Sequence, residues 1–215
     1  MGKLVYDENL YNKFYVFRDR QDAGRKLARF IPDFENIIAI PAGGVPVAAE
    51  VSKIKGAELK ILLVSKILLP WTTEAGFGAV SMFGDIEINK KLAEKLDEDV
   101  INLQIEKTIE KIEHRKKLIP EKFFNFKKGS SAVLVDDGLA SGYTMLVAVK
   151  SARRFFNKVA VASPTASSSA VKLLKEYCDL YVLNLRDLYP YAVADAYINW
   201  YDVSDEEVLE ILKNF

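Results

Sequence analysis

The sequence is poor in the residues that build disulfide frameworks and metal sites. Its 215 residues include one cysteine, Cys178, and one histidine, His114. A single cysteine cannot form an internal disulfide, and one Cys with one His cannot complete a zinc site without carboxylates or a second chain. The sequence therefore excludes a disulfide-stapled scaffold, and we expect the protein to work in a reducing compartment.

An excess of charge of one sign is also missing. Thirty Lys and Arg balance thirty Asp and Glu, so no global field recruits nucleic acid, and any anion site must be local. The longest apolar run, 61–71, is interrupted by Lys66 and Pro70, far short of the roughly 20 residues that span a bilayer. No signal peptide opens the chain. We therefore expect a soluble, cytoplasmic protein with neither a nucleic-acid nor a membrane partner.

Glycine and proline are too scarce for a collagen-like or disordered chain, whereas half of the residues are apolar and 28% are charged. This composition is typical of a packed globular protein. Apolar bursts rich in β-branched residues alternate with helical patterns, which predicts an α/β protein whose parallel β-sheet is flanked by helices. The predicted strands lie at 36–41, 59–65, 131–137, 158–164 and 179–184.

Helices and loops can be placed between these strands. Isoleucines that step by three and four between residues 97 and 120 predict one long amphipathic helix. Ser204 and Glu207 form a capping box that predicts a terminal helix. The Ser-rich stretch 163–169 is predicted to be a strand-to-helix loop. No linker divides the chain, so we expect a single domain over residues 1–215.

The candidate chemistry is concentrated in residues 133–144, VLVDDGLASGYT. A predicted strand ends in two acids, Asp136 and Asp137, and a loop of small residues then opens a helix. Unpaired backbone N–H groups at a helix start can surround a phosphate, whereas carboxylates suit neighbouring hydroxyls or a metal ion. A ribose 5-phosphate meets both demands, and a side chain at Gly142 would fill the phosphate volume. The predicted phosphate loop consists of Gly138, Leu139, Ala140, Ser141, Gly142, Tyr143 and Thr144.

This segment resembles the PRPP-binding signature of the type I phosphoribosyltransferases, where PRPP is 5-phosphoribosyl 1-pyrophosphate. The shared pattern is a hydrophobic strand, two acids, three loop residues, Ser or Thr, Gly, any residue and Thr. Residues 17–30, 110–118 and 200–208 further resemble a little-described subgroup of this family. The resemblance implies the family fold, with a small C-terminal hood at about residues 187–201.

The stretch PAGGVPVAAE, after the first predicted strand, resembles the pyrophosphate loop of the same family. There, close backbone approach to a diphosphate requires Gly43 and Gly44. Family members often carry Arg or Lys at the position of Ala42. Its absence leaves the diphosphate charge to Lys66, Mg²⁺ and the backbone amides.

Residues 66–81 occupy the place of the mobile loop that closes over the reaction centre in these enzymes. Lys66 opens this segment and would contact the diphosphate; extending its ammonium group into solvent is the alternative. Arg20 and Arg115 are candidate phosphate donors from neighbouring elements or a second subunit, although most arginines on charged helices are solvated. Closure of the loop would exclude water from PRPP.

The resemblance places the acceptor base under the hood. Tyr189 or Tyr191 would stack on a planar base and Val193 would lend backbone groups to its edge, with a plain aromatic packing cluster as the alternative. In the 6-oxopurine salvage enzymes an Asp stands at the position of Ala140. Alanine, found there in the adenine and uracil enzymes, cannot take a proton. Hypoxanthine and guanine are therefore poor candidate acceptors.

The sequence is consistent with two candidate functions. The first is a Mg²⁺-dependent phosphoribosyltransferase that moves the 5-phosphoribosyl group of PRPP to a nitrogenous base, with Asp136, Asp137 and Lys66 as catalytic residues and Mg²⁺ held through PRPP rather than by direct protein ligands. We expect it to be a homo-oligomer, specifically a dimer. The second is a non-catalytic PRPP or nucleotide sensor on the same fold, favoured by Ala42 and Ala140.

Overall fold

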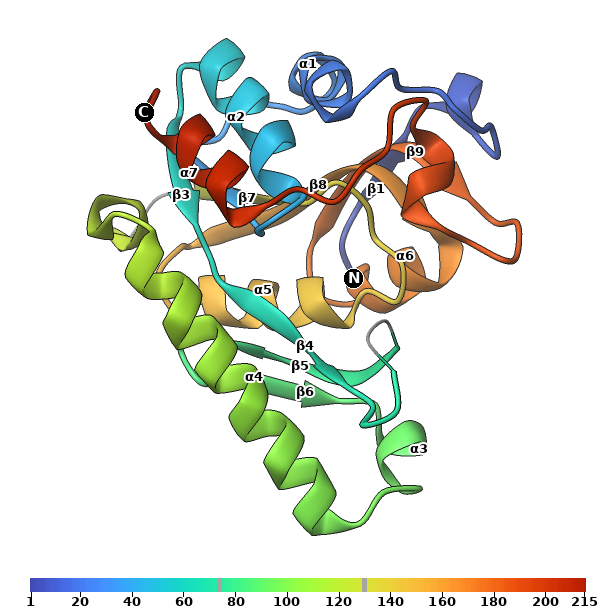
Figure 1. Cartoon of the computed structure of the whole chain (residues 1–215). Helices are drawn as coiled ribbons and strands as arrows, with labels where there is room; N and C mark the ends of the chain where they lie inside the picture. The colour runs from blue at the N-terminus through green and yellow to red at the C-terminus, as the bar shows by residue number, and fades with distance from the viewer. Residues whose placement is uncertain (73–74, 129–130) are drawn as a thin grey trace.

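The computed structural model describes residues 1–72, 75–128 and 131–215 (Figure 1). Within these ranges the main sheet has six strands in the order β1-β9-β8-β7-β2-β3. All of its strand pairs are parallel, and helices lie on both faces, which confirms the predicted α/β class. The strands are β1 Leu4–Tyr6, β2 Asn36–Ala39, β3 Glu58–Ile61, β7 Ser131–Val135, β8 Lys158–Ser167 and β9 Asp179–Arg186.

Two apolar cores lie on the two faces of this sheet. In β7, Val133 and Val135 belong to the core beneath α1, α2 and α7, whereas Ala132 and Leu134 belong to the core against α5 and α6. Successive strand residues point to opposite faces, so this alternation sets the direction of any side chain that follows the strand. The helices are α1 Arg20–Phe30, α2 Gly44–Lys55, α5 Tyr143–Ala152, α6 Ser168–Leu174 and α7 Asp205–Leu212.

A second, antiparallel sheet has the order β4-β5-β6 and lies between α4 and α5 (Figure 1). Its strands are β4 Val64–Leu68, β5 Gly76–Ser81 and β6 Ile86–Ile88, followed by α3 Lys90–Ala93 and α4 Glu98–Leu118. The long helix predicted between residues 97 and 120 is thus confirmed as α4. No helix in the described ranges is both long and apolar enough to cross a bilayer.

Two predictions about this region were wrong. The segment 59–65 is not one strand, because the chain leaves the main sheet after Ile61 and enters the second sheet at Val64. The segment 66–81 is not a loop, because its described residues lie mostly in the β4–β5 hairpin, while 73–74 fall outside the described residues. The glycines of this segment favour a loop when only the sequence is considered. In the structure, a side chain at Gly78 would collide with β6, because its Cβ would lie 2.5 Å from a backbone oxygen of that strand. The missing side chain instead permits close strand pairing.

The predicted loop at 163–169 was also wrong, because β8 continues to Ser167 and α6 follows at once. Its polar side chains are buried and bonded within the fold: Ser163 Oγ donates to the Thr165 carbonyl at 2.9 Å, and Thr165 Oγ1 donates to Asn184 Oδ1 at 2.9 Å. The predicted terminal helix and its N-cap are confirmed, since the Ser204 side chain accepts from the N–H of Glu207 at the start of α7, while the Glu207 carboxylate accepts from the Tyr201 hydroxyl. The short edge strand β1 had no counterpart in the sequence prediction. Single-turn helices lie at η1 Glu8–Leu10, η2 Glu121–Phe124 and η3 Val193–Ala196.

Candidate functional site

A cavity of about 210 Å³ opens where β7 and β8 end. The carboxyl edge of a parallel sheet is the usual place for ligands in open α/β folds. All but one of the lining residues were predicted site residues, the exception being Met145. The lining residues are Lys66, Asp136, Gly138, Leu139, Ala140, Ser141, Gly142, Thr144, Met145 and Val193. The remaining predicted site residues, Ala42, Gly43, Gly44, Asp137, Tyr143, Tyr189 and Tyr191, lie outside this lining.

A larger cavity, of about 600 Å³, lies elsewhere in the molecule. It is lined by phenylalanines, among them Phe83, Phe126 and Phe155, and by Lys116 and Glu121. None of the predicted site residues lines it. Size therefore does not single out the functional site, whereas the grouping of carboxylate, hydroxyls and loop backbone does.

The phosphate loop is fastened to the neighbouring strand. The Leu139 N–H donates to the Thr165 carbonyl at 3.0 Å, and the Leu139 carbonyl accepts from Ser167 N–H at 2.9 Å. The Ser167 hydroxyl donates to the carbonyl of Ala140 at 2.6 Å. These bonds hold the loop to the end of β8. Because Gly142 provides no side-chain cap, the first N–H groups of α5 have no such partner and suit an anion.

Gly142 is favoured by its backbone conformation as well as by its place in the cavity lining. Its φ is +83°, in the left-handed region, and an added Cβ would first meet Ala170 Cα of α6, at 3.2 Å. Backbone conformation and the approach of α6 therefore favour glycine here, and its role in leaving room for a phosphate stays a prediction. At Gly138 the restriction comes from the hood, since an added Cβ would lie 2.3 Å from Val193 Cγ1. Val193 therefore sits directly over the loop.

The two acids that follow β7 differ in their further partners. Asp136 lines the cavity, whereas the Asp137 carboxylate pairs with Arg20 of α1, and the two acidic side chains also interact with each other. Asp136 Oδ1 also accepts from the Asp137 N–H at 2.9 Å. Burial and the charge of Asp137 raise the pKa of Asp136 well above its ordinary value. Burial also raises the pKa of Asp137, and the Arg20 guanidinium opposes this rise.

Arg20 is bound inside the protein and does not line the cavity. Its Nε donates to Asp137 Oδ2 at 2.8 Å, its Nη1 donates to the Tyr201 carbonyl at 2.8 Å, and its guanidinium lies 4.1 Å from the centre of the Trp200 ring. Arg115 pairs with an acid of α7 at 2.8 Å. Neither arginine lines the cavity of its own chain. Sequence reasoning missed the role of Arg20 as the partner of Asp137, because nothing local links residues 117 positions apart.

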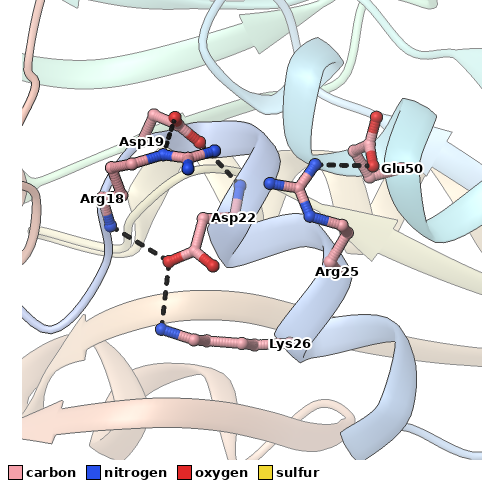
Figure 2. A network of polar contacts seen from close by, with 6 residues as sticks. All are labelled: Arg18, Asp19, Asp22, Arg25, Lys26 and Glu50. Carbon is pink, nitrogen blue, oxygen red and sulfur yellow. Dashed lines mark hydrogen bonds and ion pairs between the residues drawn. The ribbon is translucent and has the colours of Figure 1, made fainter.

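The start of α1, which carries Arg20, is fixed by a polar network (Figure 2). The Asp19 side chain caps the helix by accepting from the Asp22 N–H at 2.7 Å. One turn further, Arg25 Nη1 contacts Glu50 Oε2 at 3.1 Å and joins α1 to α2. The helix that presents Arg20 is therefore capped at its start and tied to α2, the helix that begins at the glycine turn.

The predicted pyrophosphate loop lies against both acids. A Cβ on Gly43 would lie 2.0 Å from Asp137 Oδ2, and one on Gly44 would lie 2.7 Å from the carbonyl oxygen of Val135. Both glycines are therefore required by packing against the end of β7, before any ligand is considered. Ala42 precedes them as a partly exposed residue.

Lys66 reaches the cavity from β4 of the second sheet. The antiparallel hairpin thus delivers a cation to a site otherwise built by the parallel sheet. Across the strand pair a Cβ on Gly76 would lie 2.4 Å from Lys66 Cγ, so the lysine stem lies over a residue with no side chain.

The three predicted acceptor residues of the hood lie in different environments. Val193 lines the cavity. The Tyr191 hydroxyl contacts Thr165 Oγ1 at 3.3 Å, and burial raises the pKa of Tyr191. Tyr189 is 97% exposed. Of the three predicted acceptor residues, only Val193 shares the cavity with the phosphate loop.

Comparison with known proteins identifies relatives, although no family model matches the chain. Two Mycobacterium tuberculosis proteins, from strains CDC 1551 / Oshkosh and H37Rv, are each named "Putative phosphoribosyl transferase". Both are 32% identical over 207 residues, which cover 92% of this chain and 46% of the relative. The chain thus spans about half the length of these curated relatives. The solved structure of TT1426 from Thermus thermophilus is 30% identical with a TM-score of 0.73, and the match covers 92% of this chain and 98% of that chain. The chain is thus similar to proteins named as phosphoribosyl transferases, in agreement with the resemblance of residues 133–144.

Proposed function

We propose that the chain transfers the 5-phosphoribosyl group of PRPP to a nitrogenous base and releases pyrophosphate. The observation that carries this proposal is the cavity in which Asp136 faces the loop 138–144 and the start of α5. The helix start offers N–H groups to a phosphate, and Ser141 and Thr144 add hydroxyl donors. The carboxylate accepts from ribose hydroxyls. Few ligands other than a phosphorylated sugar present both groups at this spacing.

The leaving group needs positive charge. The C1–O bond of PRPP breaks, the base nitrogen bonds to C1, and the proton of the base passes to water or to the departing pyrophosphate. Lys66 and the N–H groups of Ala42 and Gly43 would bind the negative charge that develops on the pyrophosphate, whereas the Gly44 N–H already donates to the Ile40 carbonyl. Val193 and the β4–β5 hairpin would restrict water at C1.

The described residues contain no group of three or more His, Cys, Asp or Glu side chains suited to hold a metal ion. One carboxylate, that of Asp136, lines the cavity. This set fits Mg²⁺, which is commonly held by one or two carboxylates together with substrate phosphates. When bound through PRPP, Mg²⁺ would neutralise charge on the pyrophosphate.

The acceptor is proposed to be a base that needs no carboxylate near its ring nitrogen. Ala140 lines the cavity and supplies no proton acceptor. Adenine, uracil or another planar base is therefore expected to exceed hypoxanthine and guanine. Val193 is the hood residue placed to contact such a ring.

A PRPP sensor without turnover is the second candidate. Ala42 and Ala140 favour it, since neither supplies charge to the leaving group nor accepts a proton. Titration calorimetry with PRPP and Mg²⁺, followed by a pyrophosphate-release assay over a panel of bases, separates the two functions. Binding with release supports the transferase, and binding without release for any base supports the sensor. Absence of binding contradicts both.

A further inference from the structure

We propose that Arg186 is a positioning residue that fixes the hood over the phosphate loop and thereby sets the affinity of the site for its acceptor. Arg186 is the last residue of β9 and does not line the cavity. It acts through Val193, the hood residue that does line it. The inference rests on the proposed function, because it assigns a role at the acceptor end of the same site.

The guanidinium of Arg186 holds the chain on both sides of Val193. Its Nη1 donates to the carbonyl of Ala192 at 3.3 Å, and Nη1 and Nη2 contact Asp195 Oδ2 at 3.2 Å and 3.3 Å. Ala192 directly precedes Val193, and Asp195 follows it two positions later within η3. One planar cation therefore binds both ends of the short segment that carries Val193.

Two aromatic rings fix the guanidinium itself. Its central carbon, Cζ, lies 4.0 Å from the centre of the Phe14 ring and 5.4 Å from the centre of the Tyr191 ring. A cation this close to the face of an aromatic ring is attracted to it. The Tyr191 hydroxyl is in turn bound by Thr165 of β8. The position of the guanidinium is therefore set by the sheet and by the segment before α1, and the hood follows it.

The segment that carries Phe14 is also bonded to the hood. Tyr15 N–H donates to the Asp195 carbonyl at 2.8 Å, and Phe17 N–H donates to the Ala196 carbonyl at 3.0 Å. These bonds join the N-terminal segment to the hood backbone. Arg186 adds a side-chain bond from the hood to the end of β9, at the place where all three segments meet.

Val193 is the residue through which this arrangement reaches the cavity. An added Cβ on Gly138 would lie 2.3 Å from Val193 Cγ1, so the hood rests on the first residue of the phosphate loop. A shift of the segment 192–195 would move Val193 away from this contact. The acceptor must lie next to C1 of the ribose while the phosphate stays in the loop. We therefore expect such a shift to weaken acceptor binding more than PRPP binding.

Stability alone does not explain an arginine at this position. The Arg186 side chain is fully buried, whereas that of Asp195 is 34% exposed. Arg186 Nε is buried and has no hydrogen-bond partner among the described residues. Burying a cation and leaving a buried donor unpaired both cost free energy, so an apolar side chain of similar length should support the fold about as well. What the arginine provides is one fixed geometry of the hood.

Steady-state kinetics of the whole chain, with adenine and with uracil as acceptors, test this role. Arg186→Met keeps an unbranched side chain and removes the guanidinium. We expect it to raise the KM of the acceptor about tenfold and to change the KM of PRPP less than about twofold. Arg186→Lys keeps the charge without the fork and should recover part of the acceptor affinity. An unchanged acceptor KM in Arg186→Met, or an equal rise in both KM values, would overturn the proposal.

Arg154→Met is the matched control. Arg154 also pairs with an acid, Asp85 at 3.3 Å, and its guanidinium also lies near a ring, 5.8 Å from the centre of Phe83. It contacts neither the hood nor the cavity lining, so we expect both KM values to stay at the wild-type level. A rise of the acceptor KM in Arg154→Met as large as that in Arg186→Met would contradict a specific role of Arg186.

A measurement without ligand separates this inference from the proposed function. In the wild type, NMR should show a strong NOE between the Val193 methyl groups and the α-protons of Gly138, because the two residues are in contact. Arg186→Met should weaken this NOE and accelerate amide exchange at Tyr197, whose N–H bonds within the hood. Exchange at Leu180, near the other end of β9, should stay at the wild-type rate. An unchanged NOE, or equal acceleration at Leu180, would contradict the positioning role.

A second variant serves if Arg186→Met does not fold. Phe14→Leu removes one of the rings that hold the guanidinium and leaves Arg186 paired with Asp195, so no buried charge loses its partner. It should weaken the same NOE and raise the acceptor KM about twofold or more. Wild-type values of both would overturn the proposal. If the wild type turns over no base, the proposed function fails, and the NOE and the exchange rates still decide the role of Arg186.

Discussion

Two segments meet over the cavity and are built in different ways. The loop 138–144 follows β7 directly and is fixed by bonds to the adjacent end of β8. The hood, residues 187–201, contributes Val193 to the cavity, while Tyr191 bonds to Thr165 and Tyr189 faces solvent. In the short loop 138–144, the residues stay close together because they are neighbours in the chain. In the longer hood, each side chain lies where its contacts with distant parts of the fold place it.

The largest loss of activity is expected at Asp136, the carboxylate that lines the cavity next to the loop 138–144. Asp136→Asn should lower kcat/KM for PRPP about 100-fold, because hydrogen bonds to a charged acceptor contribute about 1.5–3 kcal/mol each. Steady-state kinetics of pyrophosphate release would measure it. Asp187→Asn is the matched control, since this acid follows β9 and bonds to Ser168 outside the cavity lining. Equal losses in both variants would show that Asp136 has no special role.

Contact between the two segments is tested at Gly138. In Gly138→Ala the new methyl would overlap Val193, whose Cγ1 lies 2.3 Å from the Cβ position. Crowding of this kind costs about 1–3 kcal/mol of unfolding free energy, and displacement of the hood should lower turnover as well. Adding Val193→Ala should restore part of the stability, as measured by urea unfolding, because it removes both Cγ atoms and leaves only the Val193 Cβ, at 2.9 Å. If the second change restored no stability, the destabilisation by Gly138→Ala would not arise from contact with Val193.

Backbone conformation at the loop is tested at Gly142. Gly142→Ala should cost about 1–2 kcal/mol of unfolding free energy for the left-handed conformation, plus the contact with Ala170. Gly56→Ala is the matched control, because Gly56 has φ +63° and nothing within 4 Å of its Cβ position. The difference between the two variants then isolates the approach of α6. A smaller loss at Gly142 than at Gly56 would contradict this packing.

The pH dependence of stability follows from Asp136. Its pKa is raised by burial and by Asp137, so its contribution to stability is present below the unfolded pKa of about 3.9 and is lost as pH rises through the higher folded value. The charged groups that face it are Asp137, Arg20 and Lys66. Asp136→Asn should therefore gain stability relative to the wild type as pH rises, in urea unfolding at pH 4 and pH 7. A gain that shrinks over this interval would contradict the raised pKa.

The smallest effects are expected from the hood tyrosines. Tyr189→Ala should change unfolding free energy by less than about 0.5 kcal/mol, because the ring is exposed. Tyr191→Phe should cost about 1 kcal/mol through the lost contact with Thr165. If either ring stacks on the base, its replacement by alanine raises the KM of the acceptor and leaves that of PRPP unchanged. Unchanged acceptor KM in Tyr189→Ala and Tyr191→Ala would leave Val193 as the hood contact.

The sequence predicted the features that depend on local pattern. Buried strands, the long helix α4 and the cap at Ser204 follow from periodicity and capping chemistry. The cavity-lining residues between Gly138 and Thr144, all but Tyr143, follow from one contiguous motif. Each of these features is encoded within about a dozen residues.

The features that the sequence did not predict depend on tertiary partners. The hairpin β4–β5 resembles a loop in sequence because Gly76 and Gly78 look like breakers until their partner strands are known. Burial of Thr165 depends on Asn184 in the next strand. Likewise, nothing near Arg20 or Asp137 in the chain indicates that the two side chains meet.

The phosphoribosyl site is tested most directly by a crystal structure of the protein soaked with ribose 5-phosphate. The phosphate is expected within hydrogen-bond distance of the loop 138–144, with a ribose hydroxyl on Asp136. Density for the ligand at another surface, or a ribose with no hydroxyl within hydrogen-bond distance of Asp136, would contradict the proposed site.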